Sequence, residues 1–294
     1  MLISMIAPVY NVAPFFEEFI QSVRHQTLTD FELILVDDGS SDGSSAMCDQ
    51  FARDDERIKV IHQANQGASA ARNHGLEVVI SDYIAFVDSD DVLDADYLQV
   101  LYDNLIEYQA DIAITNFKVF NQTDDCFYYY LQAADLYTKE LTPQEACEYQ
   151  SDWDLNASLF IVPFGKLFKA ELLEHFRFPE GMIFEDEASI HRLYMKAQKL
   201  VLVNENHYTY RQGIDSVMSK SFNEQKVVDL IKCFQIKLTD FVMAGFDIIP
   251  TRNRFERILL DYKEQIEAMN QTDSHGYHLI EEMLTFCGHY HGPR

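Results

Sequence analysis

The first hundred residues alternate short apolar runs with segments in which apolar residues recur at helical spacing. Leu2–Ala7 is an apolar run that suits a buried strand, and the apolar side chains of Pro14–Gln26 return every three or four positions. The alternation continues with short connections, which predicts an α/β fold with a mostly parallel sheet flanked by helices. The other expected strands are Phe31–Val36, Arg57–His62 and Tyr83–Val87, and the other expected helices are Gly43–Arg53, Gly67–Ile80 and Asp94–Tyr108.

The second half of the chain has a less regular pattern. Asp111–Phe120 and Cys126–Tyr137 are strand-like, Pro163–His175 suggests a loop followed by a helix, and Glu187–Lys199 suggests a helix. From about residue 222 the pattern is helical throughout. We therefore expect one domain over residues 1–218 and a C-terminal helical region over 219–294, with the boundary near 216–222. The three expected C-terminal helices are Glu224–Met243, Asn253–Met269 and His278–Cys287.

Three of the expected N-terminal strands end in polar clusters. These clusters are Pro8–Asn11, Asp37–Ser40 and Asp88–Asp91. Because ligands bind beyond the carboxyl ends of parallel strands, the three clusters should converge on one edge of the sheet. Acidic groups that are far apart in the sequence would then share one site.

The charge balance excludes several classes of partner. The chain has 23 Lys and Arg residues against 48 Asp and Glu residues, so its formal net charge is −25. Such a surface repels nucleic-acid phosphates and anionic lipid. A phosphate-bearing ligand would need a local cation, and a bound metal is one way to supply it.

Cysteine usage and hydropathy indicate a cytoplasmic protein. The five cysteines are widely spaced and form no Cys-x-x-Cys pair, which favours a reducing compartment. The N-terminal residues have no basic segment typical of a secretory signal, and no apolar run reaches the roughly 18–20 residues that a spanning helix needs. The sequence leaves open whether the protein contacts a membrane surface and whether it forms homo-oligomers.

Asp88-Ser89-Asp90 is the first candidate for chemistry. Two carboxylates at positions i and i+2, directly after a buried strand, can reach one hard cation such as Mg²⁺ or Mn²⁺. A cation held there would neutralise charge on a leaving diphosphate. The alternative is that Asp88–Asp91 only cap the following helix.

Two further segments carry polar groups toward the same edge. In Asp37–Gly43 a carboxylate could accept hydrogen bonds from a base or ribose, or the segment could be a capped turn. In Asn65–Asn73, Arg72 could pair with a phosphate or with Asp88 and Asp90, or simply neutralise the acidic edge. No Gly-x-Gly-x-x-Gly follows the first strand, so this is not the dinucleotide-binding fingerprint.

Glu185-Asp186-Glu187 is the fourth candidate segment. A carboxylate opposite a sugar's leaving group could act as general base on an acceptor hydroxyl. Three consecutive acids are also typical of a solvated helix start.

Taken together, these segments resemble glycosyltransferase family 2. The resemblance is dense over residues 3–95 and sparser to about 218. It implies the GT-A fold, a Rossmann-like, mostly parallel sheet flanked by helices, and a reaction that inverts configuration at the anomeric carbon. The segments that carry it, in order, are Pro8–Asn11, Val36–Gly43, Asn65–Gly75, Phe86–Asp91, Gly181–Asp186 and Tyr208–Arg211.

The resemblance also implies a role for individual residues. Asp186 corresponds to the catalytic base, with Glu185 as its neighbour, and Asp88 and Asp90 to the site of a divalent metal, Mn²⁺ or Mg²⁺, that holds the diphosphate. Arg211 would reach the diphosphate from a C-terminal loop, and His207 could complete the metal shell or be structural. The implied contacts to the nucleotide-sugar donor are Pro8, Asp37, Asp38, Asn65, Arg72, Asp88 and Arg211.

The function that follows is transfer of a sugar from a nucleotide-sugar donor, expected to be a UDP-sugar, to a hydroxyl of a glycan, glycoprotein or surface-polysaccharide acceptor. The alternative is a non-catalytic nucleotide-sugar-binding or scaffold protein of the same fold. A nucleotidyltransferase would want a Gly-rich basic loop after the first strand, which Pro8–Asn11 does not offer. The aromatic residues of Phe127–Tyr130, with Tyr137 and Trp153, could stack on sugar rings or belong to the core.

Overall fold

Two strands that are buried along nearly their whole length form the centre of the N-terminal half. The computed structural model describes residues 2–151, 155–213 and 223–289. In it, all seven residues of β2 (Phe31–Asp37) are buried, as are six of the seven in β1 (Ile3–Val9). Strands covered by helices on both faces are continuously apolar, which is why these two runs were readable from the sequence.

The sheet is mixed but mostly parallel in its N-terminal half. Its strand order is β3-β2-β1-β4-β9-β6-β10-β5, with β7 paired to β6 and β8 paired to β10. The pairs β1–β2, β1–β4, β2–β3 and β6–β10 are parallel, whereas β9 runs antiparallel to both β4 and β6. The remaining strands are β3 (Ile58–His62), β4 (Tyr83–Phe86), β5 (Val92–Leu93), β6 (Ile112–Asn121), β7 (Cys126–Tyr129), β8 (Tyr137–Leu141), β9 (Lys166–Lys169) and β10 (Leu200–Gln212).

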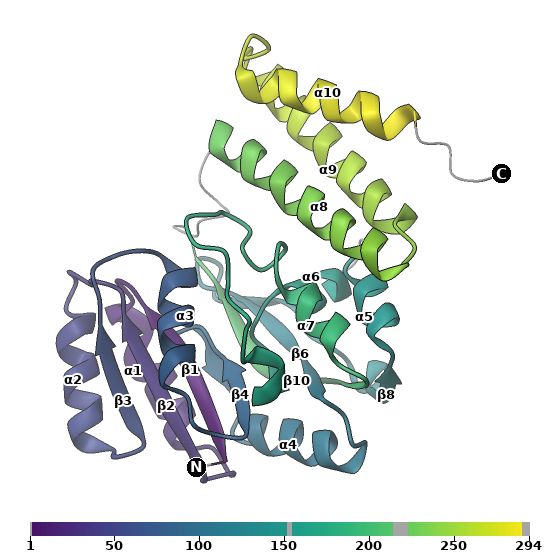
Figure 1. The fold of residues 1–294 in the computed structure, drawn as a ribbon. Coiled ribbons are helices and arrows are strands. Elements are labelled where there is room, and N and C mark those ends of the chain that lie inside the picture. The colour runs from purple at the N-terminus through teal and green to yellow at the C-terminus, as the bar shows by residue number, and fades with distance from the viewer. Residues whose placement is uncertain (1, 152–154, 214–222, 290–294) are drawn as a thin grey trace.

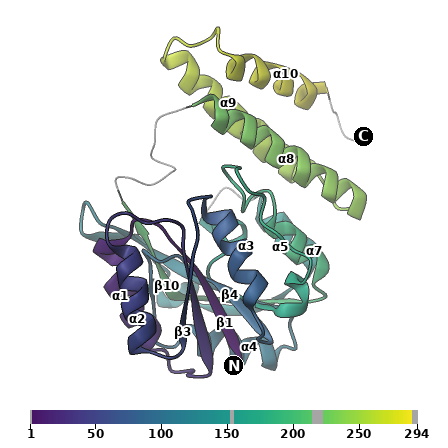
Figure 2. The same cartoon turned by 60° about the vertical axis from the view of Figure 1, so that its left-hand side comes forward.

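Helices cover both faces of this sheet, and the predicted α/β class is confirmed. Helices α1 and α2 lie on one side and α3 on the other, as Figure 2 shows. The four expected strands and four expected helices of the first 108 residues are all present, with shifted ends. The helices of this part are α1 (Ala13–Arg24), α2 (Ser44–Asp54), α3 (Ala68–Val78), α4 (Tyr97–Glu107), α5 (Pro143–Tyr149), α6 (Leu155–Ile161) and α7 (Ile190–Lys196).

Helix α3 packs against β1 through a glycine. A Cβ atom on Gly75 would lie 2.5 Å from Cγ2 of Ile6, which no relaxed contact allows. We expect Gly75→Ala to lower the free energy of unfolding by about 1–3 kcal/mol, as other overpacking substitutions do. Urea denaturation measures this loss. Gly213→Ala is the control because a Cβ there meets open space, and equal effects of the two changes would contradict the packing argument.

Two predictions for the middle of the chain are wrong. Pro163–His175 contains β9 and a short 3₁₀ helix, Ala170–Leu173, instead of a loop and an α-helix. Cys126–Tyr137 is not one strand, because β7 ends at Tyr129 and a 3₁₀ helix, Ala133–Asp135, precedes β8. In both places the strands have only four or five residues, too few to show a period.

Three C-terminal helices stand together beyond one edge of the sheet (Figure 1). They have a hydrophobic core of their own, built from residues such as Phe234, Phe255, Leu259 and Ile280, which is separate from the main core. The predicted boundary at 216–222 lies outside the described residues. The helices are α8 (Glu224–Ala244), α9 (Ile249–Ala268) and α10 (His275–His289).

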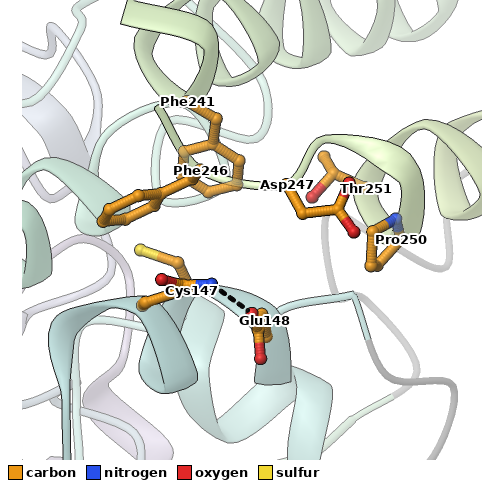
Figure 3. A pocket seen from close by; sticks show the side chains of 8 residues that line it. Cys147, Glu148, Phe241, Phe246, Asp247, Pro250 and Thr251 are labelled. Atoms are coloured by element: carbon orange, nitrogen blue, oxygen red, sulfur yellow. Dashed lines mark hydrogen bonds between the residues drawn. The ribbon is translucent and has the colours of Figure 1, made fainter. Parts of the chain in front are cut away.

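The turn between α8 and α9 rests on α5. Phe241 belongs to the main hydrophobic core, and Figure 3 shows Phe241 and Phe246 above Cys147 of α5. Nearby, the hydroxyls of Ser151 and Thr251 are 2.7 Å apart. Helix α8 therefore spans from the main core to the C-terminal core. Within the described residues, no helix is long and apolar enough to cross a bilayer.

Candidate active site

The carboxylates at the end of β2 are buried and hold the loop before α3. Asp38 accepts hydrogen bonds from the backbone N–H groups of Gln66 and Gly67, both at 2.8 Å, and from Nε2 of Gln63 at 2.8 Å. Asp37 accepts from the backbone N–H of Ser40 at 3.0 Å and contacts Nδ1 of His62 at 2.8 Å. Asp38 thus fixes the segment that carries the exposed Asn65.

The three strand-end clusters predicted to converge do meet. The hydroxyl oxygen of Ser40 accepts a hydrogen bond from the backbone N–H of Asn11 at 3.2 Å, which joins the first two clusters. Ser89 donates to the carbonyl of Pro8 at 2.6 Å, which joins the first and third. Pro8 therefore lies between the Asp37–Ser40 turn and the Asp88–Asp91 segment.

Arg72 connects this edge to a segment more than a hundred residues away. The guanidinium is buried, 5% exposed, and donates to Asp88 at 3.0 Å and to Glu185 at 2.8 Å. It also lies over the ring of Phe178, 5.5 Å from the centroid. Arg72 thereby brings the Asp88–Asp91 segment and the Glu185–Glu187 segment to one site, which the sequence did not indicate directly.

The carboxylates after β4 are crowded. Burial and the nearby charge of Asp88 raise the pKa of Asp90 to about 6, and burial with the charges of Asp90 and Asp88 raises that of Asp91 as well. Asp91 accepts from the hydroxyl of Tyr208 at 2.7 Å and from the backbone N–H of Arg211 at 2.7 Å. The helix-cap alternative for Asp88–Asp91 is wrong: α4 starts at Tyr97, its N-cap is Asp96, and β5 lies in between.

The donor set at Asp88 and Asp90 fits a hard divalent cation. The two side chains offer only carboxylate oxygens, which Mg²⁺ and Mn²⁺ prefer, and the pKa of Asp90 is raised by burial and by the nearby charge of Asp88. Among the described residues, no three His, Cys, Asp or Glu side chains are arranged as a complete metal site. That is compatible with a cation that takes one or two carboxylates and completes its shell with phosphate oxygens.

Asp186 lies in a partly buried loop before α7. Burial and the neighbouring Glu185 raise the pKa of Asp186 to about 7, against opposing contributions from the Glu187 N–H and Arg72. Its Oδ1 accepts a hydrogen bond from the backbone N–H of Glu187 at 2.7 Å. A carboxylate with a pKa near the working pH suits a general base, because it can take a proton and also release it.

The loop around Asp186 is not a solvated helix start, and that alternative is wrong. Glu187 is only 5% exposed and pairs with Lys237 and Arg254 of the C-terminal helices. Phe184 has a backbone φ of 68°, in the left-handed region that bulky residues avoid. Such strain costs about 1–3 kcal/mol and persists only where the surroundings impose it.

Arg211 differs from its predicted setting, whereas His207 is held by two carboxylates, as its structural alternative expects. Arg211 lies in strand β10, not in a loop, and its guanidinium donates to Glu18 at 2.8 Å and lies over Phe15. The ring nitrogens of His207 contact Asp96 at 2.9 Å and Glu205 at 3.0 Å. Because both ring nitrogens are engaged by these two carboxylates, the structure does not join His207 to Asp88 or Asp90.

Sequence reasoning missed three residues near the acids. Tyr208 is fully buried and links Asp91 to the backbone N–H of Asp88. Burial and the charges of Asp91, Asp88, Asp90 and Asp186 raise the pKa of Tyr210 to about 12. Lys166, whose amine donates to the carbonyls of Val162 and Phe164, has its pKa lowered by burial to about 7. Only the alternation of Tyr208 and Tyr210 could have been noticed beforehand.

The aromatic residues of the β6–β7 hairpin are mostly on the surface. Phe127, Tyr128, Tyr130 and Tyr137 are each about half exposed, so the core alternative does not hold for them. Only Tyr129 packs inward, against Phe117. Trp153 lies outside the described residues.

Comparisons with known proteins give a consistent picture. The family model described as glycosyl transferase family 2 matches residues 4–177. The chain is 39% identical over 278 residues to glycosyltransferase GlyG of Streptococcus pneumoniae, covering 94% of this chain and 92% of that protein. It is 33% identical to glycosyltransferase GlyA of the same organism, with 90% of this chain aligned to 37% of the relative. The cholesterol galactosyltransferase of Borreliella burgdorferi is 30% identical over 231 residues, 74% of this chain and 62% of that protein.

A solved structure shares the fold over the whole chain. S. aureus TarS, residues 1–349, crystallised in complex with UDP-GlcNAc, superposes with a TM-score of 0.65 at 19% identity. The match covers 99% of this chain and 93% of that one. It extends the shared architecture through the C-terminal helices.

Proposed function

This chain belongs to glycosyl transferase family 2 and is a glycosyltransferase, and on that premise we propose that it inverts configuration as it moves a sugar from a UDP-sugar to an acceptor hydroxyl. The acceptor class is a glycan, glycoprotein or surface polysaccharide. Within this proposal, residues 1–218 form the transferase domain and residues 219–294 the C-terminal helical region.

The observation that carries the proposal is the bridge made by Arg72. It joins Asp88, on the segment assigned to the diphosphate, to Glu185, the neighbour of Asp186. A transferase needs its leaving group and its acceptor base in one site, on opposite sides of the reacting carbon. The crystallised complex of TarS with UDP-GlcNAc supports UDP as the nucleotide.

The residues of this chain would then act as follows. Asp186 removes the proton of the acceptor hydroxyl while that oxygen bonds to the anomeric carbon and the bond to the UDP oxygen breaks. Arg72 and Arg211 contribute positive charge near the departing diphosphate. Asp88 and Asp90 would hold Mn²⁺ or Mg²⁺, which supplies Lewis-acid neutralisation of the diphosphate when bound. Pro8, Asp37, Asp38 and Asn65 line the nucleoside end.

Turnover of a small donor panel tests the proposal. We expect one of UDP-glucose, UDP-galactose or UDP-N-acetylglucosamine to be consumed with Mn²⁺ present, and chelation to stop the reaction. Titration calorimetry with UDP and Mn²⁺ covers the alternative outcomes. Binding without turnover across an acceptor series would favour the non-catalytic alternative, and absence of UDP binding would refute the donor-site assignment.

The pH dependence follows from the raised pKa of Asp186. A general base acts in its deprotonated form, so kcat/KM should rise with pH up to about 7 and then level off. A carboxylate at its ordinary pKa would give a rate already flat above about pH 5. The measurement is kcat/KM for transfer between pH 5 and 9. A flat profile over that range would contradict the assignment of Asp186 as a base with a raised pKa.

A further inference from the structure

Helix α8 holds the backbone of the loop that carries Asp186. We call residues 181–187 the base loop. Asp229 of α8 accepts a hydrogen bond from the backbone N–H of Ile183 at 2.9 Å. One turn further along α8, the thiol of Cys233 donates to the carbonyl of Phe184 at 3.3 Å. Two successive residues of the loop are therefore fixed by one helix of the C-terminal region.

A buried ion cluster anchors the end of the base loop. Arg254 of α9 donates to both carboxylate oxygens of Glu187, at 2.7 and 2.8 Å, and Lys237 of α8 donates to Oε1. Burial would raise the pKa of Glu187, but the charges of Lys237 and Arg254 outweigh it and hold that pKa at about 2. Because an unpaired buried carboxylate is costly, Glu187 cannot leave these helices without a new partner. Asp186 is its direct neighbour.

The strained residue of the base loop is held by the same helices. The side chain of Phe184 packs against the C-terminal hydrophobic core, while its backbone keeps a φ of 68°. A conformation of this kind needs surroundings that impose it. Here the surroundings are the C-terminal core and α8.

Helix α8 is itself tied to the element that follows the base loop. Asp240 near its C-terminus contacts Nε2 of His191 at 2.9 Å and Nε of Arg192 at 2.6 Å, both on α7. The base loop and α7 are thus braced by the same helix along its length, as the neighbouring positions of α7 and α8 in Figure 1 show.

We propose that α8 and α9 position the catalytic base, and that Asp229, Lys237 and Arg254 are positioning residues for sugar transfer. This inference rests on the proposed role of Asp186. It makes the C-terminal helical region part of the active centre, because the orientation of Asp186 is set by contacts from residues that lie 46 or more positions further along the chain than the loop residues they hold.

Hydrogen exchange tests the positioning directly and needs no substrate. We expect Lys237→Met, Arg254→Met and Asp229→Ala to speed amide exchange in the base loop by about tenfold or more, because each removes a contact that keeps it closed. Lys232→Met is the matched control, since Lys232 is exposed on the same helix. Asp229→Ala leaves the ion cluster intact and covers the case in which a cluster variant fails to fold. Unchanged exchange in the folded variants would overturn the proposal.

Kinetics then show whether the positioning serves the reaction. In the full-length chain, kcat for transfer should fall about 10- to 100-fold in the three variants, since small misplacements of a catalytic group have effects of that size. The Kd for UDP should stay within twofold, and Lys237→Arg should recover most of the rate. Faster exchange with an unchanged kcat would refute the link to catalysis. If the wild type turns over no donor, the proposed function fails, while the exchange result still decides the positioning.

Discussion

Replacing Asp186 with asparagine is expected to lower kcat for sugar transfer by about 100- to 10,000-fold, the contribution of a positioned general base. Asparagine keeps the size of the side chain and its carbonyl oxygen, which can still accept from the Glu187 N–H. It cannot take the proton of the acceptor hydroxyl. Binding of UDP should be unchanged, because the amide is neutral and the donor contacts lie on other segments. Initial rates with saturating donor, and calorimetry with UDP, measure the two effects.

A control substitution distinguishes loss of the catalytic base from loss of any acidic side chain. Asp82→Asn removes one exposed carboxylate that belongs to none of the segments assigned to the site and should leave kcat unchanged. If Asp186→Asn kept its rate within about threefold of the wild type, the base would have to be another group, since that loss is far below what general-base catalysis contributes.

Removal of Arg72 should have the second-largest effect, on stability and activity together. In Arg72→Met the carboxylates of Asp88 and Glu185 lose the cation between them. Breaking a buried ion pair lowers the free energy of unfolding by about 3–5 kcal/mol. Because Asp88 and Glu185 are partly exposed, we expect a loss of about 3 kcal/mol here. Transfer should fall by about 100-fold or more, as when one charge-stabilising donor is deleted. Urea denaturation and initial rates are the two measurements.

The geometry of the guanidinium can be tested with a second variant. Arg72→Lys keeps the charge but has one donor group, and it cannot bridge two carboxylates in a fixed plane. Relative to Arg72→Met, we expect Arg72→Lys to recover more of the free energy of unfolding than of the rate of transfer. Arg53→Met, on the exposed side of α2, serves as the control for loss of an arginine. Equal recovery of stability and rate by lysine would mean that charge alone matters at this position.

The parts of the fold that could be predicted are those governed by local pattern. Strands β1 and β2 are long enough, and buried enough, to be continuous apolar runs, and the helices between them have clear spacing. Strand β9 has four residues and includes Lys166, a charged residue that is fully buried. Lys166 can be buried because its amine donates hydrogen bonds to backbone carbonyls at the end of α6 and in the turn after it. Such contacts between segments are not visible in the local sequence pattern.

The residues of the candidate site likewise divide into those that could be identified from the sequence and those that could not. Asp88, Asp90, Asp186 and Arg72 were identifiable because they sit in motifs with characteristic order. The pair of Arg72 with Asp88 was among the expected alternatives, but the more distant partners were not identifiable, since Arg72 and Glu185 are 113 positions apart and Glu187 and Arg254 are 67 apart. The family resemblance implied a loop at Arg211, whereas pairing with β6 extends β10 through Gln212.

Strand β9 also constrains the order in which the sheet can be completed. It lies between β4 and β6, so among the described strands these four residues make the strand pairing that joins the two halves of the sheet. Both neighbouring strands, β4 and β6, precede Lys166 in the chain and are therefore synthesised before β9. Until then β4 and β6 each present an open edge, and open edges pair readily with other chains. An interrupted or slowly translated chain is therefore most exposed to aggregation just before this short strand emerges.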